Sequence, residues 1–268
     1  MSLLRKISRR FMGVGKPAAS GRPGSRAYAI GDIHGRLDLL DEILDKIESD
    51  AAGRPACETY LIVLGDLIDR GPDSAGVVER LRRYRPDGMT CVFLMGNHEE
   101  MLLRILEGDT RPLTSWLAYG GSECLFSYGV EPEALRWIED DEALRLVRER
   151  IPADHIAFLR DFGDTFAFGD YLFVHAGIRP GLPLEEQDRA DFRWIREPFL
   201  TDSRDHGCIV VHGHTIVPRV EERANRIAID TGAYRSGLLT AVGIEGDRRW
   251  YITAEIQDRD VPAVTVAA

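Results

Sequence analysis

Four short polar motifs constrain the fold of this chain more than any other feature, because each follows an apolar run rich in β-forming residues. They are Gly31-Asp32-Ile33-His34-Gly35, Gly65-Asp66-Leu67-Ile68-Asp69-Arg70-Gly71, Gly96-Asn97-His98-Glu99 and His212-Gly213-His214-Thr215. Ligand sites in open α/β sheets gather at the carboxyl ends of the strands, so the side chains of these motifs are expected to meet at one sheet edge. This arrangement predicts a metal-binding chain.

Strand and helix patterns alternate in the first part of the chain. Apolar β-rich runs at 26–30, 60–64 and 90–95 are separated by helical patterns at 37–47 and 74–84. Such a βαβαβ series predicts a mostly parallel sheet.

The rest of the chain is first helical and then rich in strands. Helical patterns at 99–107, 132–150 and 152–159 predict a helical insertion around residues 100–160, with a turn at Gly120-Gly121. Strand patterns follow at 165–168, 171–175, 208–212, 226–229, 237–242 and 250–256, and Gly169-Asp170 predicts a hairpin turn. These strands are expected to form a second sheet packed on the first, which places the chain in the α/β class.

One catalytic domain is expected over residues 26–256, between an N-terminal tail (1–25) and a C-terminal tail (257–268). The N-terminal tail has no acidic residue and six basic ones: Arg5, Lys6, Arg9, Arg10, Lys16 and Arg22. Residues 3–12 also fit a short amphipathic element that touches anionic lipid, but the composition favours a disordered tail.

Composition excludes several classes of protein. The formal net charge of -10 argues against nucleic acid as a main partner. The sequence has no 18-residue apolar stretch that would cross a bilayer, so a soluble protein is expected. The cysteines are scattered without paired spacing, which favours reduced core thiols and a cytoplasmic location. They are Cys57, Cys91, Cys124 and Cys208.

The donor set of the motifs favours an intermediate divalent ion. Asp32 and His34 are two residues apart at a strand end, so both side chains can reach one cation. Asp66 is a carboxylate that can bridge two cations. Carboxylate, imidazole and amide oxygen together suit manganese, iron or zinc better than calcium. Read singly, each of these residues also fits a capping Asp or a core His. The full candidate set is Asp32, His34, Asp66, Asn97, His175 and His214.

Two further motif residues suit phosphate chemistry. The guanidinium of Arg70 can grip two phosphate oxygens, although a surface ion pair is an equal alternative. His98 can protonate a leaving-group oxygen if a carboxylate such as that of Asp69 keeps it charged. In-line hydrolysis of a phosphoester is therefore plausible.

The order of these motifs, together with His175-Ala176-Gly177, resembles the metal-dependent phosphoprotein phosphatases within the calcineurin-like metallophosphoesterases. The resemblance covers roughly residues 26–256 and implies two packed mixed β-sheets flanked by helices. Two further stretches, 116–129 and 175–200, resemble the bacterial serine/threonine phosphatase subgroup and imply a bacterial source.

The resemblance implies a role for each candidate residue. Asp32 and His34 would bind one metal ion, Asp66 would bridge two, and Asn97, His175 and His214 would bind the second. The two divalent ions would be manganese first, with iron or zinc as alternatives.

For catalysis the resemblance implies His98 as the acid, Asp69 as the residue that holds it, and Arg70 and Arg196 as phosphate-contacting arginines. Arg193 is the alternative to Arg196, Asn97 and Tyr234 would also face substrate, Asp230 would lie near the site, and His212 would face away from it.

The implied reaction is hydrolysis of phosphoserine or phosphothreonine in protein substrates, by direct attack of a hydroxide that bridges two metal ions. The nearest alternative is a symmetrical dinucleoside tetraphosphate hydrolase, a group that tends to have Ala at the position of Asp69 and Asp at the position of Glu99. A phosphoprotein-binding module that has lost catalysis is a third possibility, but the six metal ligands, the acid and the arginine are all present. The sequence indicates neither the physiological substrate nor the oligomeric state.

Overall fold

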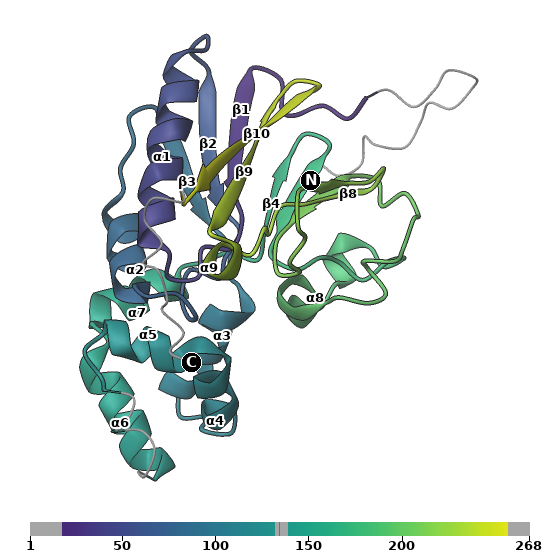
Figure 1. Ribbon diagram of the computed structural model, residues 1–268. Coiled ribbons are helices and arrows are strands. Elements are labelled where there is room, and N and C mark those ends of the chain that lie inside the picture. Colours follow the sequence, from purple (N-terminus) through teal and green to yellow (C-terminus); the bar gives the residue numbers. More distant parts are fainter. Residues whose placement is uncertain (1–17, 132–133, 135–138, 257–268) are drawn as a thin grey trace, which may run out of the picture.

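The computed structural model describes residues 18–131, 134 and 139–256, which fold into two five-stranded sheets with flanking helices (Figure 1). The first sheet has the order β10-β9-β1-β2-β3, in which β1, β2 and β3 are parallel and β9 and β10 are antiparallel. Its strands are β1 (Ser25–Ile30), β2 (Glu58–Val63), β3 (Met89–Phe93), β9 (Leu238–Glu245) and β10 (Arg248–Glu255).

The second sheet has the order β4-β5-β6-β8-β7 and is also mixed. Strands β5, β6 and β8 are parallel, whereas β4 and β7 are antiparallel edge strands. Its strands are β4 (Thr165–Phe168), β5 (Tyr171–Val174), β6 (Ile209–His212), β7 (Glu221–Glu222) and β8 (Arg226–Ala228). The predicted fold class, two mixed sheets flanked by helices, is confirmed, and so is the hairpin turn at Gly169-Asp170.

Alternation along β1 separates two hydrophobic cores. Ala27 and Ala29 point to the second sheet, where they meet large side chains such as Phe173 and Ile227. Tyr28 and Ile30 point to the opposite face, because successive side chains of a strand face opposite sides. Small residues on one face therefore let the two sheets approach, while larger ones fill the space beneath the helices.

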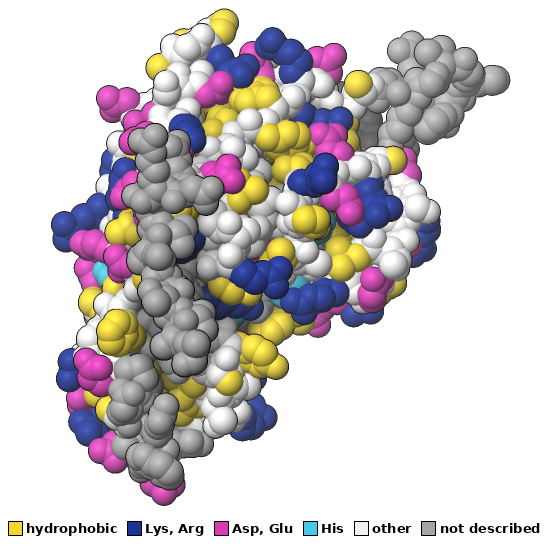
Figure 2. Space-filling model, viewed as in Figure 1, with side chains coloured by type: hydrophobic (Ala, Val, Ile, Leu, Met, Phe, Trp, Pro, Cys, Tyr) yellow, Lys and Arg dark blue, Asp and Glu magenta, His cyan; other side chains and the backbone are white. Residues whose placement is uncertain are grey.

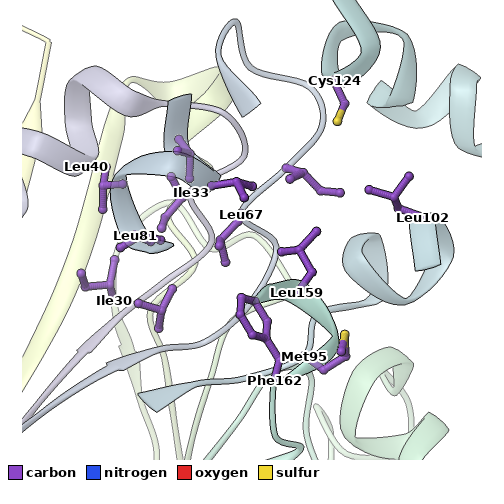
Figure 3. Close-up of a cluster of buried hydrophobic side chains, with 14 of the residues drawn as sticks. Ile30, Ile33, Leu40, Leu67, Leu81, Met95, Leu102, Cys124, Leu159 and Phe162 are labelled. Atoms are coloured by element: carbon purple, nitrogen blue, oxygen red, sulfur yellow. The ribbon is translucent and has the colours of Figure 1, made fainter. Parts of the chain in front are cut away.

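Helices cover the outer face of the first sheet, and Figure 1 shows α1 (Leu37–Ala52) and α2 (Ser74–Arg83) there. In α1 the buried residues recur at helical spacing, as an amphipathic helix requires. Figure 3 shows Leu67 near the centre of this core, with Ile33 and Leu81 on one side and Leu102 and Leu159 on the other. The loop after β2 is thus anchored by apolar contacts from several elements.

The helical insertion lies beyond the carboxyl ends of β1 to β3. It contains α3 (Asn97–Leu106), α4 (Leu113–Trp116), a kinked segment (Leu117–Gly121), α5 (Ser122–Ser127), α6 (Asp140–Arg150) and α7 (Ala153–Arg160). The remaining helices are a 3-10 turn (Leu184–Glu186), α8 (Arg189–Trp194) and α9 (Ala233–Ser236). The helix expected over 132–150 is described from residue 140 onward, and most of 132–138 lies outside the described residues.

The assignment of the last two strands to the second sheet is wrong. β9 pairs with β1, and β10 pairs with β9, so both belong to the first sheet. The free edge of β1 is thereby filled by an antiparallel strand, and Val242 and Ile244 of β9 join the core between the sheets. Strand pairing over this sequence distance depends on tertiary packing, which local patterns do not report.

Part of the predicted N-terminal tail belongs to the fold. The backbone N–H of Gly21 donates to the Gly246 carbonyl at 2.8 Å, and that of Ser20 donates to the Asp170 carboxylate at 2.9 Å. These partners bring residues 18–25 onto both sheets, whereas residues 1–17 and the tail 257–268 lie outside the described residues. All four cysteines are free thiols. None of the helices in the described part of the chain has the length and hydrophobicity that crossing a bilayer requires.

The core between the sheets predicts a large stability loss when Phe173 is truncated. Phe173 is fully buried, so we expect Phe173→Ala to lower the free energy of unfolding by about 3–5 kcal/mol. Phe126→Ala is the matched control, since Phe126 is 54% exposed and should change stability by less than about 0.5 kcal/mol. Denaturant unfolding followed by circular dichroism measures both, and similar losses would contradict this account of the core.

Candidate active site

Five strands from both sheets end at one place, and each is followed by a candidate ligand. Asp32, Asp66 and Asn97 follow β1, β2 and β3 of the first sheet, and His175 and His214 follow β5 and β6 of the second. In Figure 1 this place lies between the lower ends of the two sheets, above the helical insertion. The site is therefore built where the carboxyl ends of the central strands meet.

Asp66 lies at the centre of the cluster. Its Oδ2 atom lies 3.6 Å from Nε2 of His34 and 3.4 Å from Nε2 of His175. Its Oδ1 atom accepts the backbone N–H of His98 at 3.1 Å. Burial would raise the pKa of Asp66, but the charges of His175, His98 and His34 outweigh it and hold the pKa well below its usual range. One oxygen of an ionised carboxylate is thus shared between two groups of histidines.

Backbone carbonyls orient two of these histidines. The carbonyl oxygen of Ile68 lies 2.7 Å from Nδ1 of His34, and that of Leu64 lies 2.8 Å from Nδ1 of His175. A carbonyl can only accept, so each Nδ1 carries a proton and each Nε2 is the ring atom that faces the cluster. This is how protein metal ligands are usually held, and the donor set therefore fits metal ions.

Asn97 joins the second group of histidines. Its Oδ1 atom lies 3.0 Å from Nε2 of His175 and 2.8 Å from Nδ1 of His214. The Asp32 carboxylate accepts the backbone N–H of His214 at 3.0 Å, which brings it to the edge of the same cluster. Two groups of side chains each have donor atoms that all lie within 4.8 Å of one another. The first group is His34, Asp66 and His98, and the second is Asp66, His175 and His214. The cluster could therefore hold a dinuclear metal centre with Asp66 between the ions.

His98 is joined to a carboxylate on its far side. Nδ1 of His98 lies 2.5 Å from Oδ2 of Asp69, and Nε2 faces the cluster at 4.0 Å from Oδ2 of Asp66. Burial alone would lower the pKa of His98, but the carboxylates of Asp66 and Asp69 outweigh it and raise the pKa. The raised pKa favours the protonated imidazole, whose Nε2 faces the centre of the site.

Arg70 and Tyr234 border the same space. Nη1 of Arg70 lies 2.6 Å from Nε2 of His34, and its guanidinium carbon lies 4.9 Å from the centre of the Tyr234 ring. The Tyr234 ring in turn meets the His34 ring edge-on, with centroids 5.4 Å apart. A cation and a phenol thus stand beside the ligand cluster, where a phosphate would need donors.

The two arginines considered for the second phosphate contact, Arg193 and Arg196, differ in their contacts. Arg193 donates to the Asp164 carboxylate at 2.9 Å and lies 3.4 Å from the Glu100 carboxylate, so it is engaged in ion pairs. Arg196 is exposed, and its charge contributes, after burial and His175, to the lowered pKa of His214. Arg196 is therefore the one whose charge reaches the cluster.

Two other residues named from the sequence lie apart from the ligand atoms. The ring of His212 packs on Phe199, with centroids 5.1 Å apart, and burial lowers its pKa to about 4. Asp230 accepts the backbone N–H of Gly232 at 2.9 Å, and burial and the Asp66 charge raise its pKa to about 6. His212 thus points into the core of the second sheet, whereas Asp230 borders the site.

Backbone strain is concentrated at this site. In the described part of the chain, the non-glycine residues with positive φ are all ones that the motifs single out: His34 (44°), Asp66 (49°), Asp69 (74°), Arg70 (68°) and His214 (62°). The left-handed region costs about 1–2 kcal/mol for a residue with a side chain. Such strain persists where the surroundings fix the backbone, as is common at functional sites.

Sequence reasoning missed one residue that supplies this support. Glu99 is fully buried, and its carboxylate accepts the backbone N–H groups of Asp66 (2.9 Å), Leu67 (2.7 Å) and Gly96 (3.1 Å). Burial and the Asp66 charge raise the pKa of Glu99 to about 7. A Glu three residues after a helix start often bonds back to the N-cap backbone, and this signal could have indicated part of its role.

A separate cavity of about 700 Å³ lies at the opposite end of the first sheet. Its lining includes the C-terminal ends of α1 and α2, which carry partial negative charge. Arg80 and Arg83 line it as well, but they pair with Asp41 (2.7 Å) and Glu79 (2.6 Å). Among the described residues, the side-chain groups that could hold a metal ion lie at the strand-end cluster and not at this cavity, so the cluster is the candidate active site.

The surface around the cluster is mixed in charge. Figure 2 shows basic, acidic and apolar side chains interspersed on one face, with Lys and Arg side chains beside a visible histidine near the middle. On this face the acidic side chains therefore do not gather into one patch.

Comparison with known proteins identifies relatives of most of the folded region. A family model described as calcineurin-like phosphoesterase matches residues 25–237. Serine/threonine-protein phosphatase 1 of Salmonella typhimurium is 31% identical and aligns over 81% of this chain and 91% of its own length. The symmetrical bis(5'-nucleosyl)-tetraphosphatase of an Acidovorax species is 32% identical, and the alignment covers 59% of this chain and 46% of that relative.

Solved structures share the fold at low identity. A candidate diadenosine tetraphosphatase superposes with a TM-score of 0.61 at 20% identity, over 89% of this chain and all of that one. A protein serine/threonine phosphatase from Saccharomyces cerevisiae gives 0.54 at 15% identity, over 88% of this chain and 81% of that one. At this identity the likeness concerns the fold alone.

Because Asp66 belongs to both donor groups, the number of metal ions bound per chain should differ between a variant of Asp66 and a variant of His34. We expect Asp66→Asn to lose both metal ions, because it removes the charge common to both donor groups, whereas His34→Ala should lose only one. His206→Gln, outside the cluster, should bind as the unaltered protein does. Elemental analysis after dialysis against manganese measures ions per chain, and full retention of metal by Asp66→Asn would contradict the shared site.

Proposed function

The chain belongs to the calcineurin-like phosphoesterase family, and we propose that it is a metal-dependent serine/threonine protein phosphatase. One observation carries the proposal: an imidazole fixed by a buried carboxylate faces a cluster suited to two metal ions. His98 bonds Asp69 through Nδ1, and its Nε2 points toward Asp66. This is the geometry of an acid placed to protonate a leaving-group oxygen.

Our assignment of metal ligands is the one that the family resemblance implies, and Asp66 is the residue that it shares with both donor groups. We assign Asp32, His34 and Asp66 to one ion, and Asp66, Asn97, His175 and His214 to the other. Manganese is the first choice because the set mixes nitrogen with carboxylate and amide oxygen, and iron and zinc are the alternatives. Two such ions supply a water activated near neutral pH and neutralise charge on the phosphate.

The remaining groups would bind and orient the phosphoester. Arg70 has a planar fork of donors beside the ligand cluster, and Arg196 places a second positive charge near His214. Asn97 and Tyr234 complete the lining that we assign to substrate. His98 would give its proton to the oxygen of the leaving serine or threonine, while Asp69 keeps the imidazole oriented.

Relatives named as protein phosphatases align with this chain over most of their length, which supports the proposal. Besides the Salmonella protein, serine/threonine-protein phosphatase 2 of Escherichia coli is 31% identical over 80% of this chain and 90% of its own length. The partners would then be phosphoproteins or phosphopeptides. A cytoplasmic location is part of this proposal, since the free cysteines suit a reducing compartment.

A symmetrical dinucleoside tetraphosphate hydrolase is the second candidate, favoured by several relatives of that name. One, from Nitrosospira multiformis, is 25% identical but aligns over 94% of its own length. Two residues weigh against this candidate, because that group tends to have Ala at the position of Asp69 and Asp at the position of Glu99. Here Asp69 bonds His98, and Glu99 accepts the backbone N–H of Asp66. We therefore rank it second.

A direct comparison of substrates tests the proposal. With metal-free protein reloaded with manganese, we expect faster phosphate release from phosphoserine and phosphothreonine peptides than turnover of diadenosine tetraphosphate. The Asp66→Asn variant controls for contaminating phosphatases. A preference for the dinucleotide, with two ADP as product, would replace the proposal by the second candidate.

Removal of the Arg70 guanidinium is expected to weaken phosphate binding and rate together. We expect Arg70→Ala to lower kcat/KM by about 10²-fold, the loss of one charge-assisted pair of hydrogen bonds at a transition state. Arg111→Ala, which removes an arginine whose side chain is 85% exposed, is the control. Inhibition by inorganic phosphate is the second measurement, and an unchanged inhibition constant in Arg70→Ala would remove Arg70 from the phosphate site.

A further inference from the structure

We infer that Trp116, in the helical insertion, is a positioning residue for proton donation by His98. Its indole N–H holds the carboxylate of Asp69, which in turn holds the imidazole. The inference rests on the proposed function, in which His98 protonates the leaving-group oxygen.

A single carboxylate oxygen joins the three side chains. Oδ2 of Asp69 accepts a hydrogen bond from Nε1 of Trp116 at 2.9 Å and lies 2.5 Å from Nδ1 of His98. Oδ1 of Asp69 has no hydrogen-bond partner among the described residues. The Cys124 thiol also lies beside this carboxylate, but the hydrogen bonds to Oδ2 come from the indole and the imidazole. Of these two groups, the indole takes no part in the proposed reaction.

All three side chains are shielded from water. The exposed fractions are 0% for Asp69, 1% for Trp116 and 5% for His98. Water cannot replace a lost hydrogen bond at this depth without entering the core, so a carboxylate that loses one donor is free to turn. Because the site is buried, the indole N–H of Trp116 is a hydrogen-bond donor to Asp69 that water does not readily replace.

The insertion is built to hold this indole. Gly121 packs directly on it, since a Cβ atom there would lie 2.5 Å from the Trp116 ring. The neighbouring Gly120, with φ of 115°, accepts the backbone N–H of Arg70 at 3.1 Å. The insertion thus contacts two successive strained residues of the second motif, Asp69 through a side chain and Arg70 through the backbone.

The consequence depends on the leaving group. An alkoxide such as that of serine leaves slowly without a proton, whereas p-nitrophenolate leaves readily without one. A misplaced acid therefore slows the first kind of substrate and spares the second. Loss of packing or of metal would instead slow both.

The test is the Trp116→Phe variant, assayed with manganese on a phosphoserine peptide and on p-nitrophenyl phosphate. We expect kcat to fall about tenfold on the peptide and less than about twofold on the aryl ester, the scale of one orienting hydrogen bond to a charged group. Metal content and Tm are measured alongside. Trp194→Phe is the matched control, because the Trp194 indole N–H donates to Glu100 at 3.0 Å and not to Asp69; it should show no such difference between substrates.

A His98→Asn variant separates failure of the inference from failure of the proposed function. If His98→Asn is selectively slow on phosphoserine but Trp116→Phe slows both substrates equally or neither, the role of Trp116 is overturned and the acid stands. If His98→Asn shows no selectivity, the acid assignment in the proposed function is itself wrong, and the inference falls with it.

A second replacement covers the case in which Trp116→Phe does not fold. Benzothienylalanine placed at position 116 keeps the bicyclic shape and has sulfur where the indole has N–H. The same selective loss on phosphoserine is expected. Full activity on both substrates would show that the shape of the ring, and not its hydrogen bond, is what the site needs.

Discussion

The carboxylate of Glu99 fixes the turn on which the whole site depends. It accepts three backbone N–H groups, from Asp66, Leu67 and Gly96, and so ties the loop after β2 to the loop after β3. Asp66 has positive φ, a conformation that needs such external support. Because Asp66 is the ligand common to both donor groups, the geometry of either metal site follows from how this one turn is held.

Packing between the sheets sets the second constraint. The ligands after β1, β2 and β3 come from the first sheet, whereas His175 and His214 come from the second, so the distance between the sheets becomes a distance between ligands. The alanines of β1 allow the large aromatic residues of β5 to approach, and the contact of Asn97 with both histidines results from that approach. Apolar residues remote from the chemistry thus determine whether the second donor group is complete.

The sequence brings these candidate ligands together because its signals are local. Each ligand follows a strand within a few residues, and parallel strands must end at a common edge, so Asp32, Asp66 and Asn97 could be brought together from pattern alone. The pairing of β9 with β1 could not, because the local pattern of a strand carries little information about a partner that lies far away in the sequence. The sequence did not predict the contacts of Glu99 and Trp116 for a similar reason, because both bond to groups distant in sequence. A buried Glu or Trp gives the same sequence pattern whether it packs in a core or supports a residue of the site.

The buried charges connect metal binding to folding. Asp32, Asp230 and Glu99 surround Asp66, and their pKa values are raised by burial and by mutual repulsion of the carboxylates. Divalent cations among these groups would relieve that repulsion, so binding would favour the folded state over the unfolded one, by about 4 kcal/mol at a thousandfold excess over the dissociation constant. The strained turns and the crowded carboxylates are therefore not stabilising by themselves. They are kept in place by two apolar cores and by a few buried hydrogen bonds, and the donor cluster is the part of the fold that would gain most from bound cations.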